Sequence, residues 1–207
     1  MRLVEELEKV FDDSFPRQIQ EALIKCLFSA YKVTYEECLK FPREESHDLL
    51  PFYRWVQLRT ELRGLGGRFQ EIETTSEPNG PAPCYHILIN TERIMLTVSS
   101  VDRPGALPRP ASYRIEYANE YQLNLFNSLP EDSKVYALLI HGVNQTDKRR
   151  PAFAQIGFPA KGFESYIHRI DLFSKFETLV KSYLVPSEEV AKVTVKEFAP
   201  QVIKKMR

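Results

Sequence analysis

Hydrophobic residues recur at helical spacing through the first third of the chain. Residues 1–13 place Leu3, Leu7 and Phe11 on one face, and residues 17–31 continue after a break at Pro16. In the second segment one stripe holds Ile19, Leu23, Cys26, Leu27 and Ala30. Because apolar positions three and four apart share one side of an α-helix, the pattern predicts two amphipathic helices that bury these stripes.

Two further helices are predicted before residue 67. Thr34 and Glu37 have the spacing of a capping box, which predicts a short helix that begins there and ends near Pro42. Ser46 is a candidate cap for the next helix, which runs to residue 62 or 63 and stops at the glycines of residues 64–67. Pro51 in its first turns leaves the true start of that helix open.

From residue 68 the pattern changes to alternation and short apolar runs, which are typical of strands. Residues 68–74 are predicted to form the first strand, and residues 76–81 a turn-rich loop. Residues 84–90 and 93–101 are predicted to pair as a hairpin around a tight turn. A proline-rich connection then leads to a predicted strand at 113–117, with its aromatic side chains on one face.

The strongest strand signal is the apolar run at residues 134–141, with residues 153–158 as its expected antiparallel partner. Residues 166–172 are predicted to form another strand. Helices are expected at residues 118–127, 173–184 and 187–195. The sequence therefore predicts an α+β fold: an N-terminal helical layer packed on a mainly antiparallel β-sheet, with C-terminal helices. We expect one compact domain over residues 1–207, with a helical subdomain at 1–66 and a sheet-rich part at 67–207.

Charge is balanced over the whole chain, with 28 basic and 28 acidic residues, so no global field draws the protein to nucleic acid or a membrane. It is uneven locally. Residues 1–48 hold seven basic against eleven acidic residues, and residues 143–207 hold twelve against seven. This asymmetry is compatible with solvated faces or with a polarised binding surface.

Three cysteines without metal-ligand spacing argue against a disulfide framework or a zinc site. The N-terminal residues alternate acids with apolar side chains and contain no long apolar run, so neither a signal peptide nor a membrane span is expected there. We therefore expect a cytoplasmic protein without membrane attachment, metal or cofactor. Its oligomeric state stays open.

A metal-dependent nuclease needs an acid at the end of one strand, and an acid and a lysine two residues apart on the next. Asp102 follows one predicted strand and Glu116 lies in the next. The position two after Glu116 is Ala118, so the lysine is missing. Asp102 and Glu116 are thus candidates only for a degenerate nuclease-like site.

Histidines offer a second route to catalysis, because His86, His141 and His168 all fall in predicted strands. A sheet could bring two of them together as acid and base or as metal ligands. The alternative is that each is a hydrogen-bonded structural residue. His141 is the best catalytic candidate because it ends the core strand, where a side chain reaches the edge of the sheet.

Arginine and lysine residues form three groups that could bind phosphate if the fold brings them together. Arg59 and Arg63 lie four apart on one helix, near Trp55. Arg103, Arg109 and Arg114 lie along the proline-rich connection, and the third group, in the loop of the strongest hairpin, is Lys148, Arg149 and Arg150. The alternative is that these cations only solvate the helix face and the loops.

Three functions remain, and we expect the first. It is a non-enzymatic binding module that recognises nucleic acid or another anionic partner through its basic loops. The second is a protein-interaction or assembly subunit that uses its acidic helices or apolar surface near Phe52. The third is the metal-dependent, nuclease-like enzyme with a degenerate site.

Overall fold

The computed structural model describes residues 2–79, 84–121 and 133–184. The chain divides into two compact units, residues 1–175 and residues 176–207. In the second unit the described element is α6 (Glu177–Leu184). The first unit holds all the other described elements.

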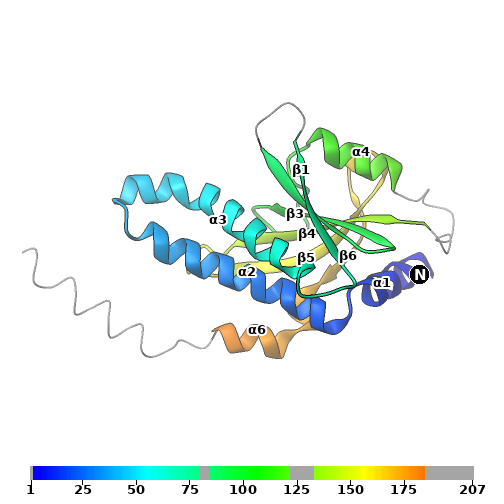
Figure 1. Ribbon diagram of the computed structural model, residues 1–207, viewed down its shortest axis with the longest axis horizontal. Helices are drawn as coiled ribbons and strands as arrows, with labels where there is room; N and C mark the ends of the chain where they lie inside the picture. The colour runs from blue at the N-terminus through cyan, green and yellow to red at the C-terminus, as the bar shows by residue number, and fades with distance from the viewer. Residues whose placement is uncertain (1, 80–83, 122–132, 185–207) are drawn as a thin grey trace, which may run out of the picture. The chain divides into compact units, whose positions relative to one another are not determined.

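Three helices precede the sheet: α1 (Arg2–Ser14), α2 (Arg17–Cys38) and α3 (Arg43–Gly66). The long helices α2 and α3 lie side by side as a helical hairpin (Figure 1). Their buried stripes include Leu23 and Leu27 on α2, and Leu58, Leu62 and Leu65 on α3. Burial of these leucines holds the hairpin together, as the helical spacing predicts.

The six-stranded sheet has its strands in chain order. They are β1 (Glu73–Pro78), β2 (Tyr85–Asn90), β3 (Ile94–Ser100), β4 (Val135–Val143), β5 (Pro151–Pro159) and β6 (Tyr166–Asp171). All neighbours pair antiparallel except β3 and β4, which are parallel. Helix α4 (Ser112–Glu120) lies in the connection between them, and the short helices η1 (Lys161–Phe163) and α5 (Leu172–Lys175) flank β6. The predicted α+β class with a mainly antiparallel sheet is confirmed.

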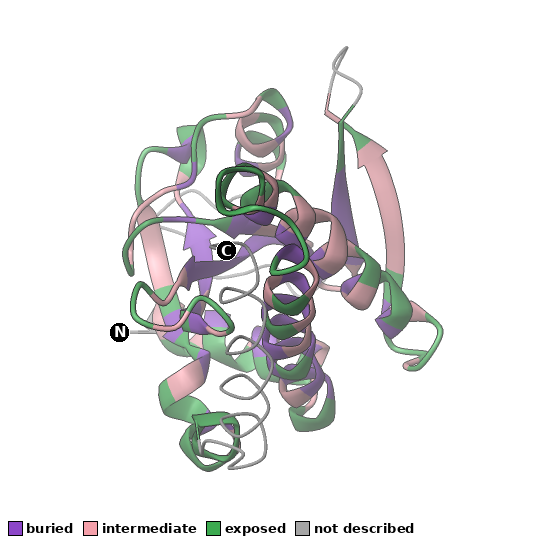
Figure 2. Cartoon of the chain, turned by 90° about the vertical axis from the view of Figure 1, so that its left-hand side faces the viewer, coloured by how far each residue is buried: buried purple, intermediate pink, exposed green. Residues whose placement is uncertain are grey.

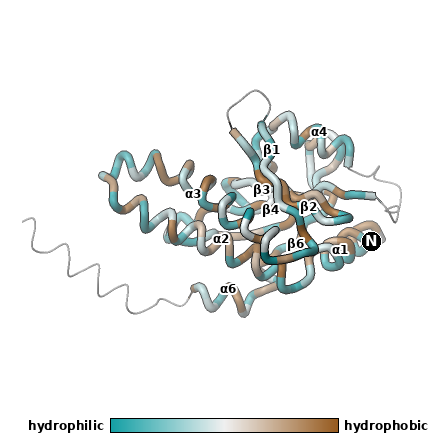
Figure 3. The backbone as a smooth tube through the Cα atoms, in the orientation of Figure 1, coloured by the Kyte–Doolittle hydropathy of each residue, from teal (hydrophilic) through white to brown (hydrophobic). Residues whose placement is uncertain are grey.

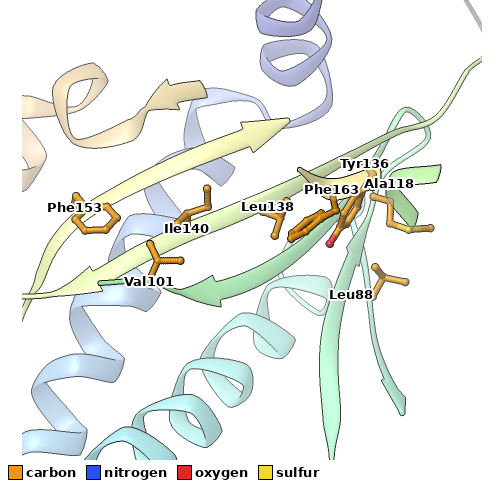
Figure 4. Close-up of a cluster of buried hydrophobic side chains, with 9 residues drawn as sticks. Leu88, Val101, Ala118, Tyr136, Leu138, Ile140, Phe153 and Phe163 are labelled. Atoms are coloured by element: carbon orange, nitrogen blue, oxygen red, sulfur yellow. The ribbon is translucent and has the colours of Figure 1, made fainter. Parts of the chain in front are cut away.

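Strand β4 is buried along almost its entire length, which explains its continuous apolar sequence. Tyr136, Leu138 and Ile140 point to the face covered by α4 and η1, where they form a cluster with Ala118 and Phe163 (Figure 4). His141 points to the opposite face and meets Tyr31 of α2. The sheet therefore lies between two helical layers, and the residues buried in the strands and helices are purple in Figure 2. Brown, hydrophobic segments mark the central strands in Figure 3.

The helices α2 and α3 correct two predictions about helix starts. Thr34 does not cap a new helix: it lies inside α2, where its hydroxyl donates to the carbonyl oxygen of Ala30 at 2.6 Å. Helix α3 begins at Arg43, before Ser46, and continues through Pro51. Burial of the apolar stripe that begins at Leu50 stabilises the helix more than the missing backbone hydrogen bond of Pro51 destabilises it.

The predicted first strand was wrong in position, and the predicted strand at 113–117 was wrong in type. Strand β1 covers Glu73–Pro78, because these residues pair with the whole of β2, and the expected loop therefore begins after it. Residues 113–117 lie in α4, and Tyr113 and Tyr117 share a helix face as readily as a strand face.

The C-terminal predictions need smaller corrections. The helix expected at 118–127 is the end of α4, which stops at Glu120, and residues 122–127 lie outside the described residues. The helix expected at 173–184 is divided into α5 and α6. The helix expected at 187–195 also lies outside the described residues.

Two glycines give opposite predictions for the same substitution. A Cβ atom at Gly142 in β4 would lie 2.8 Å from the carbonyl oxygen of Val101 and 2.3 Å from Phe153 Cε1, whereas one at Gly64 in α3 would meet nothing within 4 Å. Gly142→Ala should lower the free energy of unfolding by about 1–3 kcal/mol through overpacking. Gly64→Ala should raise it by up to about 1 kcal/mol, because glycine is disfavoured in helices. Urea denaturation measures both, and an unchanged stability of Gly142→Ala would contradict the packing at this strand end.

Candidate functional site

A cleft of about 330 Å³ opens where β3 ends and the chain turns towards α4. Its walls come from α3, from the end of β3 and the loop that follows, and from the first turn of α4. The lining residues that carry polar or aromatic chemistry are Trp55, Ser99, Ser100, Asp102, Arg109 and Arg114. The cleft therefore gathers chemistry from segments that are far apart in the sequence.

Arg114 holds one wall of this cleft in place. Its guanidinium donates to the carbonyl oxygen of Arg109 at 2.7 Å and to the hydroxyl of Ser99. It also lies 5.0 Å from the centre of the Tyr113 ring. Its Nε atom is buried and has no hydrogen-bond partner among the described residues. Arg114 thus ties the proline-rich loop to β3 and retains an unused donor.

The aromatic wall is Trp55, which is half-buried and stacked against Arg59. The Arg59 guanidinium carbon lies 3.6 Å from the centre of the Trp55 ring, and its Nη1 donates to the carbonyl oxygen of Tyr85 at 2.7 Å. Burial and the neighbouring Arg63 lower the pKa of Arg59. The Nε atom of Arg59 is also buried without a partner. Within the described segments, no carboxylate therefore accepts a hydrogen bond from this cation.

The other helix and loop cations are placed differently. Arg63 donates to the hydroxyl of Ser76 in β1, so it is turned towards the edge of the sheet. Arg109 lines the cleft, whereas Arg103 is exposed in the same loop, and its carbonyl oxygen accepts from the amide of Ala106. Of the predicted helix and loop cations, Arg109 lines the cleft, and Arg59 stacks on Trp55, which is part of the cleft wall.

The third basic group, Lys148, Arg149 and Arg150, lies in the loop between β4 and β5 and is not part of the cleft lining. Asp147 accepts from Arg149 Nε at 2.8 Å and forms an ion pair with Arg150 at 3.4 Å. The hydrogen bond from Arg149 lowers the pKa of Asp147. Arg149 is further favoured as a cation by Tyr35 and Glu36 of α2. Carboxylates of the protein therefore already balance two of these three charges.

The nuclease arrangement predicted from Asp102 and Glu116 is only half present. Asp102 follows the end of β3, as expected, and lines the cleft. Glu116 lies in helix α4 rather than in a strand, so its predicted placement was wrong. Strands β2, β3 and β4 contain no acidic residue and no lysine. Within the three described segments, no group of three His, Cys, Asp or Glu side chains is placed to hold a metal ion.

His141 is buried between the sheet and α2, and its Nδ1 lies 2.8 Å from the hydroxyl oxygen of Tyr31. Burial, with a smaller effect of Arg54, lowers the pKa of His141 to about 3. This environment is typical of a neutral structural histidine.

The other two strand histidines have different partners. His86 stacks on Tyr113 with a ring separation of 3.8 Å and pairs with Asn79 at 2.7 Å, and burial lowers its pKa to about 4. His168 pairs with Glu8 of α1 at 2.8 Å. The sheet therefore does not join the three histidines into one site.

Two arginines important to this region were not among the predicted site residues. Arg114 was noted only as part of the proline-rich connection, and its two hydrogen bonds depend on the tertiary structure. Arg54 is buried in the apolar stripe of α3, between Leu50 and Leu58. A charged residue at helical spacing within an apolar stripe was the available signal for Arg54.

Comparison with protein-family models, with curated proteins and with solved structures finds no match for this chain. Among the described helices, none is both long enough and apolar enough to span a bilayer.

The buried His141 predicts a decline of stability in acid. Its folded pKa of about 3 lies below the ordinary value of 6.5, so between these values the unfolded chain takes up a proton that the folded protein does not. The free energy of unfolding should therefore fall as the pH drops below about 6.5, by up to about 1.4 kcal/mol per pH unit from this one group.

Denaturation midpoints measured from neutral pH to about pH 4 test this dependence. His141→Asn should give a shallower decline, and His47→Asn, at an exposed position of α3, should leave the decline unchanged. Equal slopes for wild type and His141→Asn would show that His141 is protonated in the folded protein as readily as in the unfolded chain.

Proposed function

We propose that the protein is a non-enzymatic binding module that recognises nucleic acid, or another anionic partner, at the cleft beside Trp55. The observation that carries this proposal is that Trp55, Arg109 and Arg114 line one cleft, while Arg59 stacks on the ring of Trp55. Arg59 and Arg114 each keep a buried guanidinium nitrogen without a hydrogen-bond partner among the described residues. Such donors favour an acceptor from outside, and phosphate oxygens suit arginine well.

The aromatic wall supports a nucleic acid over a simple anion. A base can stack on an indole ring while arginines contact the neighbouring phosphates, and this combination tolerates different sequences. One face of Trp55 is covered by Arg59, which itself can stack on a base or bind a phosphate. Asp102, in the same lining, would repel phosphate and so restrict how a ligand lies in the cleft.

The cleft offers better support than the hairpin loop of residues 148–150. Asp147 already offsets the charge of Arg149 and Arg150, so a ligand phosphate would compete with an existing ion pair. Arg59 and Arg109 have no carboxylate partner among the described contacts. The proposal assigns no reaction, because β2, β3 and β4 lack the acid and lysine side chains of the nuclease arrangement.

Binding of a short single-stranded oligonucleotide tests the proposal, with the fluorescence of Trp55 as the signal. Trp55 is the only tryptophan of the chain, so its emission reports on the cleft directly. The combined variant Arg59→Ala with Arg109→Ala should weaken binding at least about tenfold and make its salt dependence shallower, because phosphate contacts release counterions.

The matched control changes Lys148, Arg149 and Arg150 together to alanine. It removes more positive charge than the cleft variant, yet it should weaken binding less, because two of these side chains already pair with Asp147. An equal loss in the two variants would point to overall charge rather than the cleft. Unchanged affinity in the cleft variant would contradict the proposal.

A second function, an assembly subunit, is favoured by one separate observation. Leu39 and Phe41, in the turn between α2 and α3, and Phe52 on α3 expose 62%, 49% and 61% of their surface. Exposed large apolar side chains on one helical hairpin are candidate protein contacts.

This second function predicts self-association that depends on the helical hairpin. The combined variant Phe41→Glu with Phe52→Glu should shift the protein to the monomer mass in sedimentation experiments, because it places charges in the contact. Exchange of the exposed Lys40 for glutamate is the control, since it adds negative charge to the same turn and removes no apolar surface. A wild-type protein that is monomeric at all concentrations would contradict this function.

A further inference from the structure

Arg54 is a buried cation whose hydrogen-bonding capacity is largely unused. Its side chain projects from α3 towards α2, and only 6% of the residue surface is exposed. The guanidinium carbon lies 4.3 Å from the centre of the Tyr31 ring, which gives a cation–π contact. Its Nε and Nη2 atoms are buried, and neither has a hydrogen-bond partner in the part of the chain that the structure describes. These two atoms can form the paired donors that arginine offers to a phosphate group.

The groups around Arg54 leave its charge unbalanced. Tyr31 and Cys38 are the neighbours that would favour the cation if ionised, but burial raises the pKa of both well above neutral pH. His141, on the other side of Tyr31, is neutral, because burial lowers its pKa to about 3. A buried charge without a counter-charge is costly, and proteins normally pair it.

Arg54 lies directly behind the wall of the cleft. The next residue of α3, Trp55, lines the cleft, as does Ser100 at the end of β3. The Ser100 side chain is near enough to the hydroxyl of Tyr31 to oppose the rise in the pKa of that tyrosine that burial causes, and Arg54 stacks on the tyrosine ring. One layer of side chains therefore connects the cleft to the unpaired guanidinium.

We infer that Arg54 binds the terminal phosphate group of a ligand that lies in the cleft, an inference that rests on the proposed function. To reach Arg54 a phosphate must pass the side-chain layer of Tyr31 and Ser100, and a terminal phosphate is less hindered than one within a chain, which has nucleotides on both sides. Its oxygens would accept from Nε and Nη2 together and would supply the missing counter-charge. Free phosphate and the 5′-phosphate of an oligonucleotide share this chemistry.

The first experiment uses inorganic phosphate alone and compares melting temperatures in phosphate and in sodium chloride of equal ionic strength. Specific binding should raise the melting temperature of the wild type by about 3 °C at a tenfold excess over the dissociation constant. Arg54→Met should lose this increase, whereas Arg43→Met, an exposed arginine of the same helix, should keep it. A rise in Arg54→Met equal to that of the wild type would overturn the inference.

Arg54→Lys covers the case in which the methionine variant does not fold. It keeps the charge but loses the paired donors, so the phosphate-dependent rise should be smaller than in the wild type. A full response in Arg54→Lys would show that paired donation from Arg54 is not used, and would also overturn the inference.

The second experiment separates this inference from the proposed function. A 5′-phosphorylated oligonucleotide should bind the wild type several-fold more tightly than the same strand without the phosphate, and Arg54→Met should remove the difference. Equal binding of both strands to the wild type would overturn the inference and leave the proposed function intact. Absence of binding by either strand would contradict the proposed function, and the inference about the ligand's terminal phosphate with it.

Discussion

The parallel pairing of β3 with β4 is the constraint on which the rest of the structure depends. Parallel neighbours cannot be joined by a tight turn, so the chain between them must leave the sheet and return to its opposite end. Helix α4 lies in this connection and covers Tyr136, Leu138 and Ile140. Because β3 and β4 are parallel, their last residues lie at the same end of the sheet. The cleft at that end is therefore a product of topology as much as of local sequence.

The sheet also explains why buried polar groups gather where they do. Successive residues of a strand face opposite layers, so His141 must point to the helices α2 and α3 once Ile140 packs on the other side. Tyr31 meets the histidine there, and its ring carries the guanidinium of Arg54. A tyrosine can do both, because its ring is apolar and its hydroxyl is polar. The arginine is the one member of this set that keeps a charge.

Sequence patterns predicted the elements that are buried on one face or on all sides. The predictions were least reliable where the spacing of apolar residues fits both a helix and a strand. The apolar run of β4 and its antiparallel partner β5 were evident, because no other placement buries them. Residues Tyr113 and Tyr117 fit a strand face and a helix face equally well, and tertiary packing on Tyr136 favours the helix. Arg59 and Arg109 were predicted as basic residues, but their places relative to the cleft were not. Arg109 lines the cleft and Arg59 stacks on Trp55 in its wall, and the fifty positions of chain between the two arginines give no sign of this arrangement.

The arginines differ in whether their donor atoms are already hydrogen-bonded within the described part of the protein. Arg149 satisfies its donors on Asp147, which is what a surface cation does when solvation and loop geometry are its main tasks. Arg54, Arg59 and Arg114 instead keep buried nitrogen atoms without acceptors among the described residues. The Nε atom of Arg150 also lacks a hydrogen bond there, but it lies 3.4 Å from a carboxylate oxygen of Asp147. Leaving such donors unpaired lowers stability, and burial makes the loss larger than it would be at the surface. An anion that reached these donors would recover that loss as binding energy, which is the physical basis of the proposed binding at the cleft.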